Sequence, residues 1–254
     1  RNASDTYSMG VFKSTDGGIT WDTTGLQYGF TEQKKTNGLL INPLDTNSLT
    51  LATSAGIFKS YDAGATWQSR QTAFFQQIIQ HPADTAIMYA YGYTTSGTGQ
   101  FYRSDNGGFS WQITASFPST RRIEIAVTKA NPAIVKLVAA GLDYGLEGIY
   151  NSTDTGKTFV KIFDDQNCDS NILASSSRGN RCGGQGWYDL TIQISPVNEN
   201  HVIVGGVNTW FSTDGGENWT VANQWNNTLT GVTIVHADKH CHKFHPMQPG
   251  VLYE

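Results

Sequence analysis

A short motif recurs five times along this 254-residue chain, and its repetition constrains the fold more than any other sequence feature. The motif reads Ser-x-Asp-x-Gly-x-x-Trp, with Asn for Asp in the third copy and Phe for Trp in the fourth. The first four copies recur every 44 to 48 residues and the fifth follows after a longer step. Such a period is typical of solenoids, propellers and other repeat arrays. The Asp or Asn positions are Asp16, Asp62, Asn106, Asp154 and Asp214.

The chemistry of the motif predicts a hairpin turn. Each copy stands between short β-prone runs, such as residues 56–59 before the second copy and 158–162 at the end of the fourth. Asp and Ser side chains bond nearby backbone N–H groups, and Gly adopts a positive φ at no steric cost. The closing aromatic residue can cover the inner side of the hairpin. A calcium loop is disfavoured, because such a loop closes on an acidic residue.

Between the motifs, the chain alternates short apolar runs with polar turns. Residues 190–196 and 201–205, for example, read as two strands joined by a Pro-containing turn. The period-2 alternation of these runs favours strands over helices. Each repeat therefore reads as strand, turn, strand, loop, strand, motif and strand, and no helix is predicted.

These residues match the Asp-box, or BNR repeat, and the chain resembles the Asp-box proteins over essentially its whole length. Those proteins include sortilin-type receptors, sialidases, xyloglucanase-type glycoside hydrolases and photosystem assembly factors. The resemblance implies an all-β β-propeller of four-stranded antiparallel blades, with the box between the third and fourth strands and about five repeats seen. In those families the box is a structural device, so the resemblance implies little about chemistry.

We expect one Asp-box propeller domain over residues 1–254, with an insertion at about 164–186. Residues 1–21 hold the second half of a blade, and residues 241–254 hold the first two strands of another. Either the two half-blades close a five-bladed ring, or the chain is part of a larger propeller. The second alternative is favoured because related Asp-box proteins are larger, so the chain is expected to continue into further domains.

Composition restricts the partners. The formal net charge is −4 and only 15% of residues are charged, which argues against nucleic acid or an anionic membrane surface as a partner. No apolar run approaches the roughly 20 residues of a membrane-spanning helix, so no membrane insertion is expected. Sparse Lys and the polar, aromatic composition favour a secreted or cell-surface location.

Two of the three cysteines, Cys168 and Cys182, flank a Ser- and Asn-rich stretch without a strand pattern. A disulfide would order such a loop, contributing about 3 kcal/mol in the chain-entropy model. We favour this pairing over two free thiols, because disulfides suit an extracellular protein. Cys241 is left over.

The first strand of each propeller blade lines the central channel, and two of these strands begin with conspicuous residues. The first sequence contains Trp187 and Tyr188, which offer a stacking surface for a sugar or peptide, followed by Asp189. The other interpretation is that these aromatic residues pack the preceding insertion onto its blade. Long loops in compact domains are often functional.

The second sequence is a histidine-rich run that we expect to be a strand. Period 2 would place His236, Asp238, His240 and His242 on one face. Imidazoles with a carboxylate suit a divalent transition metal, the one cofactor that the sequence raises. A polar channel wall without metal is the alternative.

Three functions remain open from the sequence. The leading hypothesis is an extracellular binding or adhesion propeller that recognises a glycan or peptide at the channel mouth through Trp187, Tyr188, His236 and His240. The first alternative is a xyloglucanase-like glycoside hydrolase with Asp189 and Asp238 as its paired carboxylates. A sialidase is less consistent, because its three substrate-binding arginines are not evident. The second alternative is a structural domain of a large surface protein or filament.

Overall fold

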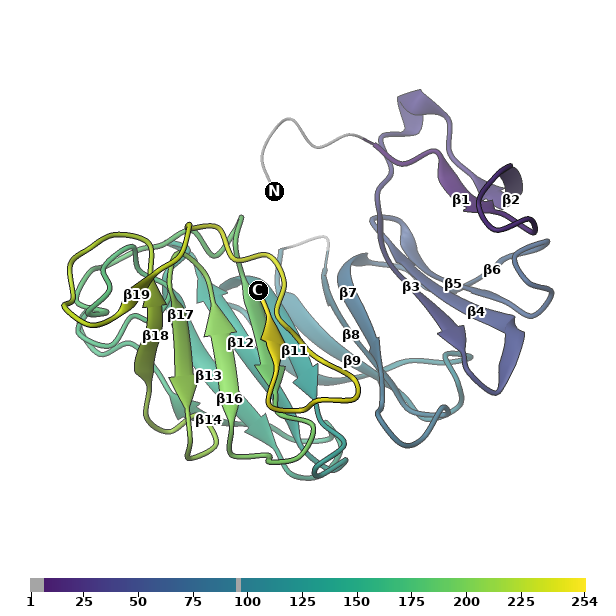
Figure 1. Ribbon diagram of the computed structural model, residues 1–254. Coiled ribbons are helices and arrows are strands. Elements are labelled where there is room, and N and C mark those ends of the chain that lie inside the picture. Colours follow the sequence, from purple (N-terminus) through teal and green to yellow (C-terminus); the bar gives the residue numbers. More distant parts are fainter. Residues whose placement is uncertain (1–6, 95–96) are drawn as a thin grey trace. The chain divides into compact units, whose positions relative to one another are not determined.

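The computed structural model describes residues 7–94 and 97–254, and it is an all-β structure built of antiparallel sheets (Figure 1). Its described residues include one short 3₁₀ helix, Phe30–Glu32, which the sequence did not predict. The described part of the chain contains no helix that is long and apolar enough to cross a membrane. The predicted fold class, four-stranded blades with Asp-box turns, is confirmed.

Two compact units divide the chain, one ending at Ser116 and the other beginning at Phe117. The first unit begins with a two-stranded sheet and continues with two four-stranded meanders. The two-stranded sheet pairs β1 (Gly10–Lys13) with β2 (Asp22–Gln27). The first meander consists of β3 (Thr36–Asn42), β4 (Asp45–Thr53), β5 (Gly56–Ser60) and β6 (Gln68–Gln71). The second consists of β7 (Phe74–Gln80), β8 (Met88–Tyr93), β9 (Gly99–Ser104) and β10 (Gln112–Phe117).

The second unit contains a four-stranded meander, a five-stranded sheet and a two-stranded sheet. The meander consists of β11 (Thr120–Val127), β12 (Val135–Gly141), β13 (Leu146–Ser152) and β14 (Val160–Phe163). The five-stranded sheet consists of β15 (Thr191–Ile194), β16 (Val202–Gly205), β17 (Thr209–Ser212), β18 (Thr220–Gln224) and β19 (Thr233–Ile234). The last sheet pairs β20 (Lys243–Phe244) with β21 (Leu252–Tyr253). The β19 strand, which pairs with β18 in parallel, was not predicted.

Burial follows the position of a strand within its sheet. The central strand β12 is buried along its whole length, whereas the outer strand β14 is largely exposed or half-buried. A strand covered on both faces needs a nearly continuous apolar run, and residues 135–141 supply one apart from Lys136, whose ammonium donates a 2.8 Å hydrogen bond to Asn151. The core of the second unit joins residues of β11–β13 to residues of β15–β17, and β11 contacts β15. First strands of neighbouring sheets therefore lie next to each other in this unit.

The Asp-box forms the turn between the third and fourth strands of each meander, as predicted. In the second copy, Ser60 Oγ accepts a 2.8 Å hydrogen bond from Gly64 N–H and donates one of 2.8 Å to Asp62. Asp62 in turn accepts hydrogen bonds from the backbone N–H and the hydroxyl of Thr66. The indole of Trp67 donates to the Gly64 carbonyl at 3.0 Å. The residues that recur in the motif are thus the donors and acceptors of one closed hydrogen-bond network.

These hydrogen bonds lower the pKa of the box carboxylates, so that the carboxylates stay ionised at acidic pH. The Thr66 hydroxyl is the largest cause that lowers the pKa of Asp62 to about 2. The Asn218 side chain does the same for Asp214, whose pKa is also about 2. A carboxylate that accepts several hydrogen bonds favours its charged form. The box carboxylates therefore bond within their own turns.

The third and fifth box turns also touch the preceding sheet within their units. A Cβ placed on Gly108 of the third box would lie 3.2 Å from Thr50 of β4. A Cβ on Gly216 of the fifth box would lie 3.3 Å from Ile162 of β14. Both glycines have a positive φ, 84° and 101°. Glycine is required at these positions by conformation and by the approach of the neighbouring sheet.

Candidate functional site

The candidate site centres on a turn, residues 186–189, that leads into β15. The Gln185 carbonyl accepts hydrogen bonds from the backbone N–H groups of Tyr188, at 2.7 Å, and Asp189, at 3.1 Å. Because the backbone turns here, successive side chains point in different directions. Trp187 is exposed, whereas Asp189 is buried. The sequence predicted that these residues begin a strand, and the structure places them in the turn just before it.

Asp189 is an unusual buried acid. It is 1% exposed, and neither carboxyl oxygen accepts a hydrogen bond from another residue. Burial is the main cause that raises the pKa of Asp189 to about 7, and repulsion from Asp238 adds to it. The positive charges of Arg122 and Lys239 act in the opposite direction. The carboxylate of Asp238 is therefore close enough to influence the ionisation of Asp189.

Arg122 of β11 holds the turn in place. Its guanidinium donates hydrogen bonds to the backbone carbonyls of Tyr188, at 2.9 Å, Trp187, at 3.4 Å, and Leu190, at 3.3 Å. It also forms a 2.8 Å ion pair with Glu124 on the same strand. A guanidinium presents five donors in a rigid fork, which suits several acceptors at once. Sequence analysis missed this role, because the acceptors lie 65 to 68 residues further along the chain.

An aromatic surface, which we define as Tyr144, Trp187, Tyr188 and His240, covers the turn. The rings of Trp187 and Tyr188 lie 5.4 Å apart, and Tyr144 meets Trp187 edge-on at 6.3 Å. The His240 ring packs against Tyr188 in a T-shaped contact at 4.7 Å. The Trp187 side chain is 37% exposed and His240 is exposed. Two predicted binding residues from distant parts of the sequence thus meet at one place, and Tyr144 joins them.

The histidine-rich segment does not form the predicted strand. Residues 235–242 are irregular, and Asp238 has a positive φ of 72° that no strand contains. The Lys239 N–H donates a hydrogen bond to the Gly206 carbonyl at 3.0 Å, which fixes the segment against β16. The expectation that His236, Asp238, His240 and His242 share one strand face was wrong.

The four side chains accordingly go to different surroundings. His242 is fully buried, and its Nε2 lies 3.3 Å from a carboxyl oxygen of Glu254, which also pairs with Lys239 at 3.2 Å. His236 and His240 are exposed. Over residues 7–94 and 97–254, no group of three or more His, Cys, Asp or Glu side chains is arranged to hold a metal ion. The predicted metal set is therefore not assembled: buried Lys239 and His242 contact Glu254, while His236 and His240 are exposed.

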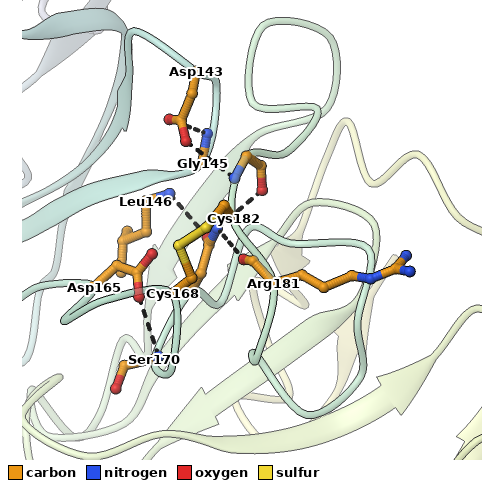
Figure 2. The surroundings of a disulfide bond; sticks show 10 residues. Asp143, Gly145, Leu146, Asp165, Cys168, Ser170, Arg181 and Cys182 are labelled. Carbon is orange, nitrogen blue, oxygen red and sulfur yellow. Dashed lines mark hydrogen bonds between the residues drawn. A yellow bond between two sulfur atoms is a disulfide. The ribbon is translucent and has the colours of Figure 1, made fainter.

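The insertion before the turn is tied down by a disulfide between Cys168 and Cys182 (Figure 2). Asn171, fully buried, donates through its amide to the Arg181 and Gly183 carbonyls and accepts from Leu146 N–H at 2.9 Å.

The same loop is fastened to the β12–β13 hairpin. Asp143 accepts hydrogen bonds from the N–H groups of Gly145, at 3.1 Å, and Gly183, at 3.0 Å (Figure 2). The Gly186 N–H donates to the Tyr144 carbonyl at 3.1 Å. The turn that carries Trp187 thus has a rigid support on the side of the insertion as well as on the side of Arg122.

Comparison with known proteins gives a fold but no close relative. No protein-family model matches the chain, and no curated protein matches it. An ancestral GH74 enzyme matches with a TM-score of 0.64 and 18% identity, over 91% of this chain and 29% of that one. The GH74 xyloglucanase from Xanthomonas campestris matches with a TM-score of 0.55 and 16% identity, over 84% and 34%. YCF48 from Cyanidioschyzon merolae matches with a TM-score of 0.49 and 17% identity, over 92% and 70%.

The two GH74 enzymes share the β-propeller fold with this chain, at distant sequence identity. The chain spans only about a third of the length of each enzyme. A shared fold at this identity does not carry an activity with it.

Proposed function

We propose that this chain is an extracellular binding module that recognises a glycan or a peptide through the aromatic surface. The observation that carries the proposal is the exposed indole of Trp187 beside Tyr188 and His240. Exposed aromatic rings offer large contact area at low conformational cost, and polar tips that can bond a ligand. The hydrogen bonds from Arg122 and the nearby disulfide fix the aromatic surface before a ligand binds. This preorganisation lowers the entropy cost of binding.

Burial of Asp189 favours binding over catalysis. A general acid must come within hydrogen-bond reach of the atom it protonates. Both carboxyl oxygens of Asp189 are buried beneath the turn, so a sugar resting on Trp187 does not touch them. In this position the carboxyl is out of reach of a glycosidic bond on the aromatic surface.

A glycoside hydrolase is the second candidate, and one observation favours it. The pKa of Asp189 is raised to about 7 beside the carboxylate of Asp238. Paired carboxylates, one of them protonated near neutral pH, are what glycoside hydrolysis needs. The fold is also similar to that of a GH74 xyloglucanase. This candidate requires the turn to open so that Asp189 reaches the substrate.

The binding proposal is tested on a glycan array and a displayed peptide library, followed by calorimetry on any ligand found. We expect Trp187→Ala to weaken binding at least tenfold. Trp21→Ala is the matched control, because Trp21 is 62% exposed and belongs to the first Asp-box. Equal binding by both variants, or no ligand at all, would reject the aromatic surface and favour a structural domain of a larger surface protein.

An assay of xyloglucan turnover distinguishes the glycoside hydrolase from the binding module. Release of reducing ends that is lost in both Asp189→Asn and Asp238→Asn would establish hydrolysis. Release that persists in either variant would exclude these residues as the catalytic pair.

A further inference from the structure

A cleft of about 700 Å³ lies in the unit that ends at Ser116. Its walls come from the β4–β5 turn, the link from β6 to β7 and the paired strands β8 and β9. Small-molecule sites in proteins occupy about 300–1,000 Å³, so the cleft is large enough for a ligand of several rings. None of its lining residues belongs to the aromatic surface.

One wall of this cleft is aromatic. Phe74, 39% exposed, and Tyr93 lie with their rings 6.2 Å apart. Tyr93 is fixed by a 3.1 Å hydrogen bond from its hydroxyl to the Gln76 side chain. Tyr102 lies deeper, 3% exposed, with its hydroxyl bonded to Gln100 at 2.8 Å. These rings present flat apolar faces whose orientation is set before any ligand enters.

The other lining groups are polar, and only one of them is charged. Lys34 supplies an ammonium, and among residues 7–94 and 97–254 no Asp or Glu lines the cleft. The remaining polar groups are the amides of Gln71 and Gln100 and the hydroxyls of Ser54, Thr72 and Thr94. Neutral hydrogen-bonding groups beside aromatic faces suit the hydroxyls and the C–H faces of sugars. The ammonium adds a preference for a carboxylate.

The polar wall is rigid. Ser54 and Lys35 are joined twice, by Ser54 N–H to the Lys35 carbonyl at 2.8 Å and by Lys35 N–H to Ser54 Oγ at 2.9 Å. Buried Thr53 accepts hydrogen bonds from the N–H groups of Ala55 and Gly56, which closes the β4–β5 turn. Lys34, next to the doubly bonded Lys35, is thereby held at the edge of the cleft. Preorganisation of this kind lowers the entropy cost of binding.

We propose that this cleft binds a short oligosaccharide that contains uronic acid. Sugar rings rest on Phe74 and Tyr93, the amides and hydroxyls bond the ring hydroxyls, and the Lys34 ammonium pairs with a uronate carboxylate. The site is independent of the aromatic surface, because the residues that form it come from the other compact unit.

The test titrates the full chain with tri-galacturonate and with neutral galactotriose, by calorimetry and by NMR. We expect tri-galacturonate to bind at least fivefold more tightly than galactotriose. Lys34→Gln removes this preference, Lys34→Arg keeps it, and Phe74→Ala weakens both sugars at least fivefold. Phe30→Ala is the control, because Phe30 is 83% exposed and does not line the cleft.

No binding of either sugar, equal binding of the two sugars by wild type, or binding that Phe74→Ala leaves unchanged would overturn the proposal. Trp187→Ala is expected to leave tri-galacturonate binding intact. A loss in that variant would move the sugar to the aromatic surface and reject the cleft.

Discussion

The guanidinium of Arg122 donates a 2.9 Å hydrogen bond to the backbone carbonyl of Tyr188, 66 residues further along the chain. This bond joins the first strand of one sheet to the turn that begins the next. It makes the position of the aromatic surface depend on a residue that does not belong to that surface.

Replacing Arg122 by Met should therefore destabilise the fold and disturb the turn together. The substitution removes the hydrogen bonds to three carbonyls and the ion pair with Glu124. Hydrogen bonds to charged groups contribute about 1.5–3 kcal/mol each, and they overlap here, so we expect a loss of about 2–4 kcal/mol. Urea unfolding measures the loss. Arg121→Met is the matched control, because Arg121 is exposed, and should change stability by less than about 0.5 kcal/mol. Equal effects would contradict the assigned role.

Asp189 should make stability fall as pH rises. Its folded pKa, about 7, lies above the value of 3.8 for an exposed Asp, so the folded state binds the proton more tightly. Ionisation therefore costs nothing below about pH 4, and the cost grows until about pH 7. The advantage of Asp189→Asn over wild type should increase by on the order of 3 kcal/mol between pH 4 and pH 8. Unfolding at several pH values measures it, with Asp22→Asn as the control, because Asp22 is exposed at the start of β2. Parallel pH profiles for wild type and Asp189→Asn would refute the shift.

The buried serine of an Asp-box should matter more than an exposed one. Ser60, 1% exposed, accepts the Gly64 N–H, and Ser60→Ala leaves that donor without its partner. An unsatisfied buried donor costs about 1–3 kcal/mol. Ser14 makes the same bond to Gly18 in the more exposed first box, so Ser14→Ala should cost under about 1 kcal/mol. Thermal melting of both variants compares them, and a larger loss in Ser14→Ala would be inconsistent with burial as the cause.

Reduction of the disulfide should loosen the turn that follows it. Cys168 and Cys182 are 14 residues apart, and closing a loop of this length contributes about 3 kcal/mol in the chain-entropy model. We expect a reductant to lower the stability of wild type by this amount and to change Trp187 fluorescence. The Cys168→Ser/Cys182→Ser variant should already be less stable and should not respond to reductant. A response in that variant would point to Cys241, the one other cysteine, instead.

The repeat could be recognised in the sequence because its recurring residues are the ones that form the hydrogen bonds of the turn. Ser60, Asp62, Gly64 and Trp67 all take part in one turn, so their spacing reports local geometry directly. Local patterns of this kind survive in any tertiary context, which explains why sheet order and turn positions were predicted correctly.

The candidate site was harder to predict from the sequence because it depends on contacts between segments that are far apart in the chain. Period 2 predicted a strand around Asp238, but a hydrogen bond from Lys239 to Gly206 and a positive φ override it. The bonds from Arg122 need β11 beside β15, which no local pattern gives. His240 was named as a binding residue, yet its partner ring, Tyr188, could not be assigned from spacing alone.

The contacts of two box glycines with the preceding sheet make the repeats that they join thermodynamic neighbours. Gly108 lies against Thr50 and Gly216 against Ile162, so a box turn contributes to an interface as well as to its own hairpin. In repeat proteins, stability is a sum of intrinsic terms and nearest-neighbour terms. Opening one blade therefore removes an interface from the blade before it. Damage should spread along the chain in steps of one repeat, and hydrogen exchange should group the amides of adjacent sheets within a unit into shared cooperative blocks.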